Sequence, residues 1–289
     1  MTLEAQKNQF IGCDKPYSQA RAVVFGAPYD CTASFRPGAR FGPAAMRAES
    51  FGIETYSPRQ DRDLVDDAAV FDVGDLELPF GAPEPALAMI GALAAGVIAD
   101  GKIPVMLGGE QLVTLGVVRE LVKKHGQELR IIHFDAHADL REDYLGSPLS
   151  HACVLRRCWD LLGDGRIFQF GIRSGTREEF QFMKAGHVKT EPFAARTLTE
   201  ALASIPAAAP LYLTVDMDVL DPAEFPGTGT QEAGGLRYAE LLTAVLQVCR
   251  GRHVVGLDNV ELCPGLDPSG RSTALACKFL RECLLALDH

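Results

Sequence analysis

The sequence lacks several features that would each point to a particular class of protein. Its eight cysteines include no CxxC pair, which argues against zinc knuckles and dithiol redox motifs. It also lacks a Lys/Arg cluster, and 28 Lys and Arg residues stand against 38 Asp and Glu residues, giving a formal net charge of −10. Because a negative chain repels nucleic-acid phosphates, we expect no nucleic-acid partner and instead a neutral or cationic ligand.

Long hydrophobic runs are absent as well. The longest apolar helix candidate, residues 86–99, is too short to cross a bilayer, and the first thirty residues show no basic segment followed by an apolar one. We therefore expect no membrane partner and a cytoplasmic protein with reduced thiols. The 289 residues are 47% hydrophobic and 23% charged, which is an ordinary globular composition. Since no linker or repeat divides the chain, we expect one domain over residues 1–289.

Short apolar runs alternate with stretches of helical spacing along most of the chain. The expected strands are residues 22–25, 69–73, 103–107, 130–134, 166–170, 211–215 and 253–257. The expected helices are residues 85–100, 112–124, 151–162, 177–184, 238–249 and 272–287. This alternation predicts an α/β fold with a mostly parallel sheet covered by helices on both faces. In such sheets, functional residues lie where strands end and lead into the next helix.

Two of the expected strands end in acidic clusters. Asp135, His137 and Asp139 follow one strand at alternate positions, so that an extended backbone would place all three on the same side. Asp216 and Asp218 follow another. A single Asp at a strand end is often a turn former or a helix cap, but that role does not explain a histidine between two aspartates.

These clusters have an electrostatic problem that metal ions would solve. Four buried carboxylates would repel one another strongly, whereas two divalent cations would cancel their charge. The ligands are mostly oxygen with one imidazole, a set that suits Mn²⁺ better than zinc or copper. The sequence therefore predicts a site for two manganese ions.

Five motifs resemble the ureohydrolases, the family of arginases and agmatinases that hydrolyse guanidino compounds to urea and an amine. They are GGEQ (residues 108–111), DAHAD (135–139), SHA (150–152), DMDVLDPAEFPGTGTQEAGG (216–235) and VE (260–261). Residues 34–43 and 256–273 are similar to the agmatinase branch, so the resemblance covers nearly the whole chain from residue 23. It implies a three-layer α/β/α fold, a binuclear manganese site and a homotrimer or homohexamer.

The resemblance also implies a ligand set. Asp135 and Asp216 would bridge both metals, His137 and Asp218 would complete one metal, and Asp139 would bind the other.

The second metal has an unusual ligand position in this sequence. Family members usually supply it with the histidine of GGDH or GGEH, and here Gln111 stands at that position. Because an amide oxygen is a weaker donor than imidazole, we expect looser binding or partial occupancy there. Glu110 is the alternative, either as the ligand itself or as a partner that orients Gln111.

Two further residues match family positions that act on the substrate. Hydrolysis near neutral pH needs a hydroxide, and water bridging two metals has its pKa lowered from about 15.7 to roughly 7. His151 resembles the proton-shuttle histidine, which would protonate the leaving amine. Glu261 resembles the glutamate that pairs with the planar guanidinium. The structural alternatives are a helix cap for His151 and a solvated loop residue for Glu261.

The function implied is hydrolysis of a small cationic guanidino substrate, with agmatine giving putrescine and urea as the first choice. Another guanidino substrate is an alternative. A second alternative is an inactive or regulatory subunit whose metal site is impaired by Gln111. Five intact ligands argue against that second alternative, because buried carboxylates are costly without metal.

Overall fold

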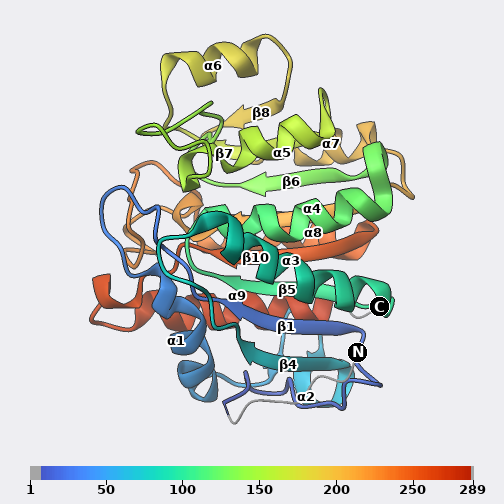
Figure 1. The fold of residues 1–289 in the computed structure, drawn as a ribbon. Helices are drawn as coiled ribbons and strands as arrows, with labels where there is room; N and C mark the ends of the chain where they lie inside the picture. Colours follow the sequence, from blue (N-terminus) through green and yellow to red (C-terminus); the bar gives the residue numbers. More distant parts are fainter. Residues whose placement is uncertain (1–7, 288–289) are drawn as a thin grey trace.

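A computed structural model describes residues 8–287, which form a parallel sheet between two layers of helices (Figure 1). Within these residues the sheet has eight strands in the order β4-β1-β5-β10-β9-β6-β7-β8, and all neighbours run parallel. The strands are β1 (Ala22–Ala27), β4 (Val70–Asp75), β5 (Ile103–Gly108), β6 (Arg130–Phe134), β7 (Ile167–Ile172), β8 (Lys189–Pro192), β9 (Leu211–Asp216) and β10 (Val254–Val260). β2 (Tyr56–Ser57) and β3 (Arg62–Asp63) form a separate antiparallel pair.

Each face of the sheet has its own helical layer and its own apolar core. One core packs beneath α1 (Gly42–Glu49), α7 (Leu198–Ser204), α8 (Tyr238–Gly251) and α9 (Arg271–Leu287). The other packs beneath α3 (Pro83–Ala99), α4 (Thr114–His125), α5 (Val154–Leu162) and α6 (Arg177–Lys184). The short helix α2 (Leu64–Asp67) follows the β2–β3 pair. Alternate strand residues enter opposite cores: Leu211 and Leu213 of β9 lie in the first and Tyr212 in the second.

The predicted three-layer α/β/α fold is confirmed, and every expected strand and helix is present with small shifts at its ends. The sequence analysis missed α1, α2, α7, β8 and the β2–β3 pair. All eight cysteines lie in the described residues and none forms a disulfide. Between residues 8 and 287, no helix combines the length and the apolar character that crossing a bilayer requires.

The strand order brings four distant segments together. β5, β10, β9 and β6 are consecutive neighbours in the sheet, and they run in the same direction. Their carboxyl ends therefore meet at one edge, where Gln111 follows β5, Glu261 follows β10, Asp216 ends β9 and Asp135 follows β6.

Candidate active site

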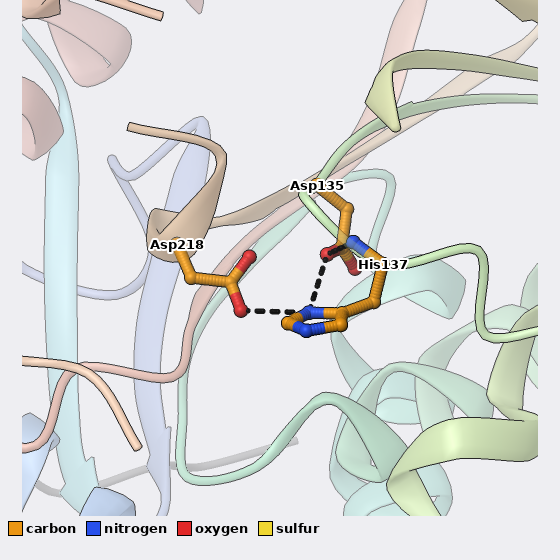
Figure 2. A group of neighbouring side chains, drawn as sticks. All are labelled: Asp135, His137 and Asp218. Carbon is orange, nitrogen blue, oxygen red and sulfur yellow. Dashed lines mark hydrogen bonds and ion pairs between the residues drawn. The ribbon is translucent and has the colours of Figure 1, made fainter. Parts of the chain in front are cut away.

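Asp135, His137 and Asp218 form a compact cluster at this edge (Figure 2). One ligand atom from each lies within 4.8 Å of the others, so the three could hold a metal ion. His137 Nδ1 is 2.9 Å from Asp218 Oδ2 and 3.5 Å from Asp135 Oδ1. The loops after β6 and β9 thus supply a mixed set of carboxylate and imidazole ligands.

Each of the two loops begins with the same kind of local turn. Asp135 Oδ1 accepts the His137 backbone N–H at 2.5 Å, and Asp216 Oδ1 accepts the Asp218 N–H at 2.8 Å. An Asp that binds the backbone two residues later folds the chain into a tight turn. The extended backbone expected for residues 135–139 is therefore wrong: β6 ends at Phe134, and Asp139 has a positive φ of 54°. The turn brings the side chains together instead.

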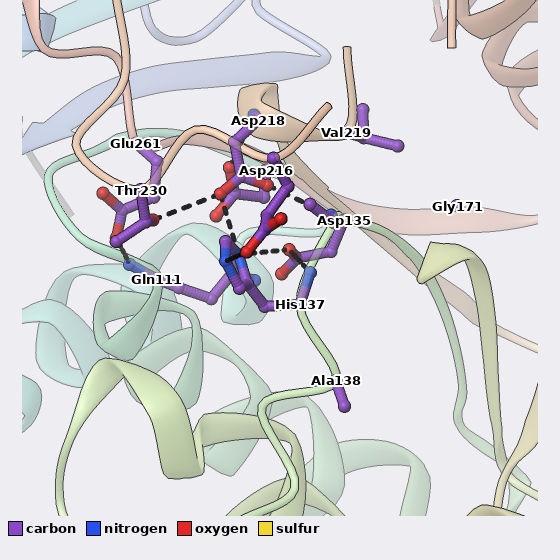
Figure 3. Close-up of polar contacts among 12 residues, drawn as sticks. Gln111, Asp135, His137, Ala138, Gly171, Asp216, Asp218, Val219, Thr230 and Glu261 are labelled. Carbon is purple, nitrogen blue, oxygen red and sulfur yellow. Dashed lines mark hydrogen bonds and ion pairs between the residues drawn. The ribbon is translucent and has the colours of Figure 1, made fainter. Parts of the chain in front are cut away.

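A pocket of about 210 Å³ collects most of the other predicted residues. Its lining includes Gln111, His137, Asp139, His151, Asp216 and Glu261. The buried Asp135 and Asp218 adjoin it through their contacts with His137. Figure 3 shows side chains from the segments after β5, β6 and β10 and from the end of β9 converging on this point. The structure thus brings all eight predicted site residues together.

Gln111 has one half of its amide occupied and the other half open. Its Nε2 donates to Thr214 Oγ1 at 2.9 Å, and its backbone N–H donates to Glu261 Oε1 at 2.8 Å. Its Oε1 is buried and has no hydrogen-bond partner among the described residues. Because an unsatisfied buried carbonyl costs about 1–3 kcal/mol, a bound cation would relieve a real cost here.

Glu110 points away from the pocket. Its Oε1 accepts the Thr32 hydroxyl at 2.6 Å, and its Oε2 accepts the Thr32 backbone N–H at 2.9 Å. Burial raises the pKa of Glu110 to about 8, although the hydrogen bonds from Thr32 act in the opposite direction. Of the two candidates for the unusual ligand position, Gln111 lines the pocket and Glu110 is engaged elsewhere.

The carboxylates are crowded enough to shift one another's ionisation. Burial raises the pKa of Asp139 and of Asp216 well above the ordinary range, and neighbouring carboxylates raise both further. Burial alone would lower the pKa of His137, but Asp218 and Asp135 raise it to about 12. The pocket therefore favours added positive charge, as a metal site does.

His151 lines the pocket and is not the residue that caps the following helical turn. It begins a short 3₁₀ turn, His151–Cys153, whose N-cap is Ser150. Its backbone N–H donates to Thr32 Oγ1 at 2.9 Å, and its Nε2 lies 3.1 Å from Ser34 Oγ. Burial lowers the pKa of His151 to about 4, and His137 lowers it further.

The sequence analysis did not select three other residues that support the site, although two of them, Gly229 and Thr230, lie in its motif at residues 216–235. Thr230 donates to Asp218 Oδ2 at 3.3 Å. Arg173 Nη2 donates to the Asp218 carbonyl at 2.7 Å and to the Glu232 carbonyl at 2.9 Å, which ties the loops after β7 and β9 together. Arg173 lies in the segment GIRSG (residues 171–175), where β7 ends, and this place at a strand end is its only sequence signal. A Cβ at Gly229 would lie 2.6 Å from the Arg36 carbonyl oxygen, so glycine is needed there.

Comparisons with known proteins agree along nearly the whole chain. The model of the Arginase family matches residues 20–286. An agmatinase of Halalkalibacterium halodurans is 46% identical over 278 residues, covering 96% of this chain and 95% of that protein. An agmatinase of Bacillus subtilis is 45% identical over the same shares of the two chains. The crystal structure of agmatine ureohydrolase of Thermoplasma volcanium has a TM-score of 0.89 at 33% identity, covering 98% of this chain and 94% of that one.

These matches exceed what a shared fold alone would give, because sequence identity is high over nearly the full length of both partners. The family is metal-dependent, which agrees with the cluster of Asp135, His137 and Asp218. The chain therefore belongs to the arginase family, in its agmatinase branch, and is a ureohydrolase.

Proposed function

We propose that this protein hydrolyses agmatine to putrescine and urea at a binuclear manganese site. The agmatinases among its relatives support the choice of substrate. The observation that carries the proposal is the convergence of acidic, imidazole and amide side chains from four strand ends on one pocket. A carboxylate-rich pocket also suits a cationic guanidinium.

The residues present fit two hard divalent cations. The donor atoms of Asp135, His137 and Asp218 already lie within 4.8 Å of one another, and Gln111 Oε1 is buried without a partner in the described chain. The proposed ligands are Asp135 and Asp216 for both ions, His137 and Asp218 for one, and Asp139 and Gln111 for the other. When bound, the ions would supply an acidified water and positive charge for the developing tetrahedral centre.

Glu261 is proposed to hold the guanidinium. Its Oε1 already accepts the Gln111 N–H, and its side chain lines the pocket. A carboxylate receives the planar N–H donors of a guanidinium side by side, which fixes the orientation of the central carbon. Glu261 has a positive φ of 64°, so its backbone turns sharply as it leaves β10.

His151 is proposed to move the proton. When the C–N bond to the leaving amine breaks, that nitrogen must gain a proton, and the imidazole is the titratable pocket side chain best suited to deliver it. The lowered pKa of His151 leaves the ring neutral at pH 7, so the ring must first take up a proton in the pocket before it can give one to the leaving amine. The Ser34 hydroxyl near Nε2 orients the ring.

Urea release from a small panel of compounds tests the proposal. The purified protein would be stripped with a chelator, reloaded with Mn²⁺ and offered agmatine, arginine and 4-guanidinobutyrate, with bound manganese counted in the same sample. We expect urea and putrescine from agmatine and nearly two ions per chain. Release from 4-guanidinobutyrate alone would correct the substrate. No urea from any compound, with one ion or fewer, would overturn the proposal in favour of a regulatory subunit.

Two further expectations concern the domain organisation and the oligomeric state of the protein. We propose that residues 1–289 form one domain and that the chain assembles as a homotrimer or homohexamer. Light scattering should then give three or six times the mass of one chain, and limited proteolysis should not release a stable fragment. A monomeric mass would refute the assembly.

A further inference from the structure

Thr32 connects two parts of the site that the sequence keeps far apart. It lies in the loop after β1, and its hydroxyl donates to Glu110 Oε1 at 2.6 Å. The same hydroxyl accepts the His151 backbone N–H at 2.9 Å. The Thr32 backbone N–H adds a second bond to Glu110, at 2.9 Å. One side chain thus links the loop after β5 to the segment that carries His151.

The loop of Thr32 also contacts the imidazole itself. Ser34, two residues further on, places its Oγ 3.1 Å from His151 Nε2. The backbone and the ring of His151 are therefore both held by this one loop. Any displacement of the loop would shift the ring relative to the pocket.

The loop after β1 is held in place by hydrogen bonds to the segment after β5 and within itself. The Gly109 and Glu110 backbone N–H groups donate to the carbonyls of Ala27 and Tyr29 at 2.9 and 2.8 Å. A Cβ at Gly109 would lie 1.9 Å from the Tyr29 carbonyl oxygen, so the two loops are in direct backbone contact. Further along, Asp30 accepts the Gly38 N–H at 2.7 Å, which folds the loop back on itself.

The segment after β5, which carries Glu110, also reaches the other side of the pocket. Gln111, next to Glu110, donates its backbone N–H to Glu261 Oε1 at 2.8 Å. The dipeptide at residues 110–111 therefore contacts Glu261 directly and His151 through Thr32. These are the residues proposed to hold the guanidinium and to deliver the proton.

We propose that Thr32 and Glu110 are a positioning pair that fixes His151 at the distance from Glu261 that the substrate requires. This inference rests on the proposed function. The carboxylate of Glu110 is fully buried and takes its hydrogen bonds from the β1 loop, so it organises that loop instead of facing substrate. Thr32 in turn holds His151 in place, because its hydroxyl accepts the His151 backbone N–H. Neither residue is expected to touch the substrate.

The test compares Thr32→Val, which removes the hydroxyl at nearly constant shape, with Thr32→Ser, which keeps it. For Thr32→Val we expect kcat for agmatine to fall by about tenfold or more, because small displacements of a reacting group are costly. KM and manganese content should stay close to the wild-type values. Thr32→Ser should restore most of kcat. Equal kcat values for Thr32→Val and the wild type would overturn the proposal, as would a loss in Thr32→Ser as large as in Thr32→Val.

A second measurement is independent of turnover. Diethyl pyrocarbonate modification of His151 would be followed by peptide mass spectrometry, with the exposed His253 as internal standard. Thr32→Val should raise the His151 rate several-fold over His253, since a loosened segment opens more often. If Thr32→Val does not fold, Glu110→Gln replaces it with the same expectation. An unchanged His151 rate refutes the pair, whereas an inactive wild type refutes only the proposed reaction.

Discussion

Without metal, the Gln111→Leu variant should be at least as stable as the wild type. With metal bound, the variant should be less stable than the wild type. The wild-type amide gains one hydrogen bond to Thr214 Oγ1 and leaves Oε1 buried without a described partner. The bond contributes about 0.5–1.5 kcal/mol, whereas the unsatisfied carbonyl costs about 1–3 kcal/mol. Removing both should raise the free energy of unfolding of the metal-free protein by about 0–2 kcal/mol.

Manganese should reverse this order. A ligand present at 100 times its dissociation constant stabilises the native state by about 2.7 kcal/mol per site. Wild type should gain at both metal positions, whereas Gln111→Leu should gain fully at only one. Urea denaturation followed by circular dichroism, at one protein concentration and with or without Mn²⁺, measures both differences. Metal analysis of the same samples counts the ions.

Gln169→Leu is the matched control. Gln169 is also buried, but its Nε2 donates to the Ala138 carbonyl at 2.8 Å and its Oε1 accepts the Thr190 hydroxyl at 3.2 Å. Because its partners would be left unsatisfied, this substitution should lower metal-free stability by about 1–3 kcal/mol. If Gln111→Leu loses as much metal-free stability as Gln169→Leu, or binds manganese as the wild type does, Gln111 is not a metal ligand.

Three other substitutions test the remaining parts of the argument. Asp216→Ala should lose bound manganese and urea release together, and activity at the wild-type level would rule out its bridging role. His151→Ala should lower kcat with manganese content unchanged; loss of folding would show a structural role instead. Burial raises the pKa of Asp267, but hydrogen bonds from Ser269 and Ser272 outweigh it and lower it to about 2. Since the folded pKa lies below the unfolded value of about 3.9, this stabilisation is complete above that pH and is lost as the pH falls through about 2. The stability difference between wild type and Asp267→Asn, about 1 kcal/mol near neutral pH, should therefore vanish in acid titrations, and a difference that persists at the lowest pH would contradict this reasoning.

The sequence predicted the elements that carry a strong local pattern. β6 has the predicted bounds, because Ile131, Ile132 and Phe134 give it the apolar character of a strand buried on both faces. β8 was missed because it is an edge strand that pairs only with β7, and its residues KTEP are polar and partly exposed. α1 was missed because it opens with Gly42 and Pro43, residues typical of loops, although proline is well tolerated in the first turn of a helix.

The acidic residues of the site were predictable because their spacing is local. Asp135, His137 and Asp139 are separated by single residues, so a reader of the sequence finds them at once. Their backbone was not predictable in the same way, because a turn closed by an Asp side chain and an extended strand both bring alternate residues near one another. Thr32 carries no local signal, since its partners Glu110 and His151 are 78 and 119 positions away. Contacts at that separation arise only from the strand order.

The proposed role of Gln111 as a metal ligand requires an amide to take over what an imidazole does. An imidazole has two nitrogens, one to bind the metal and one to donate to a neighbour. The Gln111 amide offers the same pair of functions, since its Nε2 donates to Thr214 and its Oε1 stays free of described partners in the pocket wall. What changes is the donor atom, from nitrogen to a neutral oxygen. Oxygen donors favour hard cations such as Mn²⁺ and Mg²⁺ over Zn²⁺. We therefore expect Gln111→His to raise the affinity for zinc more than that for manganese, and competition between the two metals, read out as ions bound per chain, measures the difference. An equal gain for both metals would show that the donor atom at this position does not set the preference.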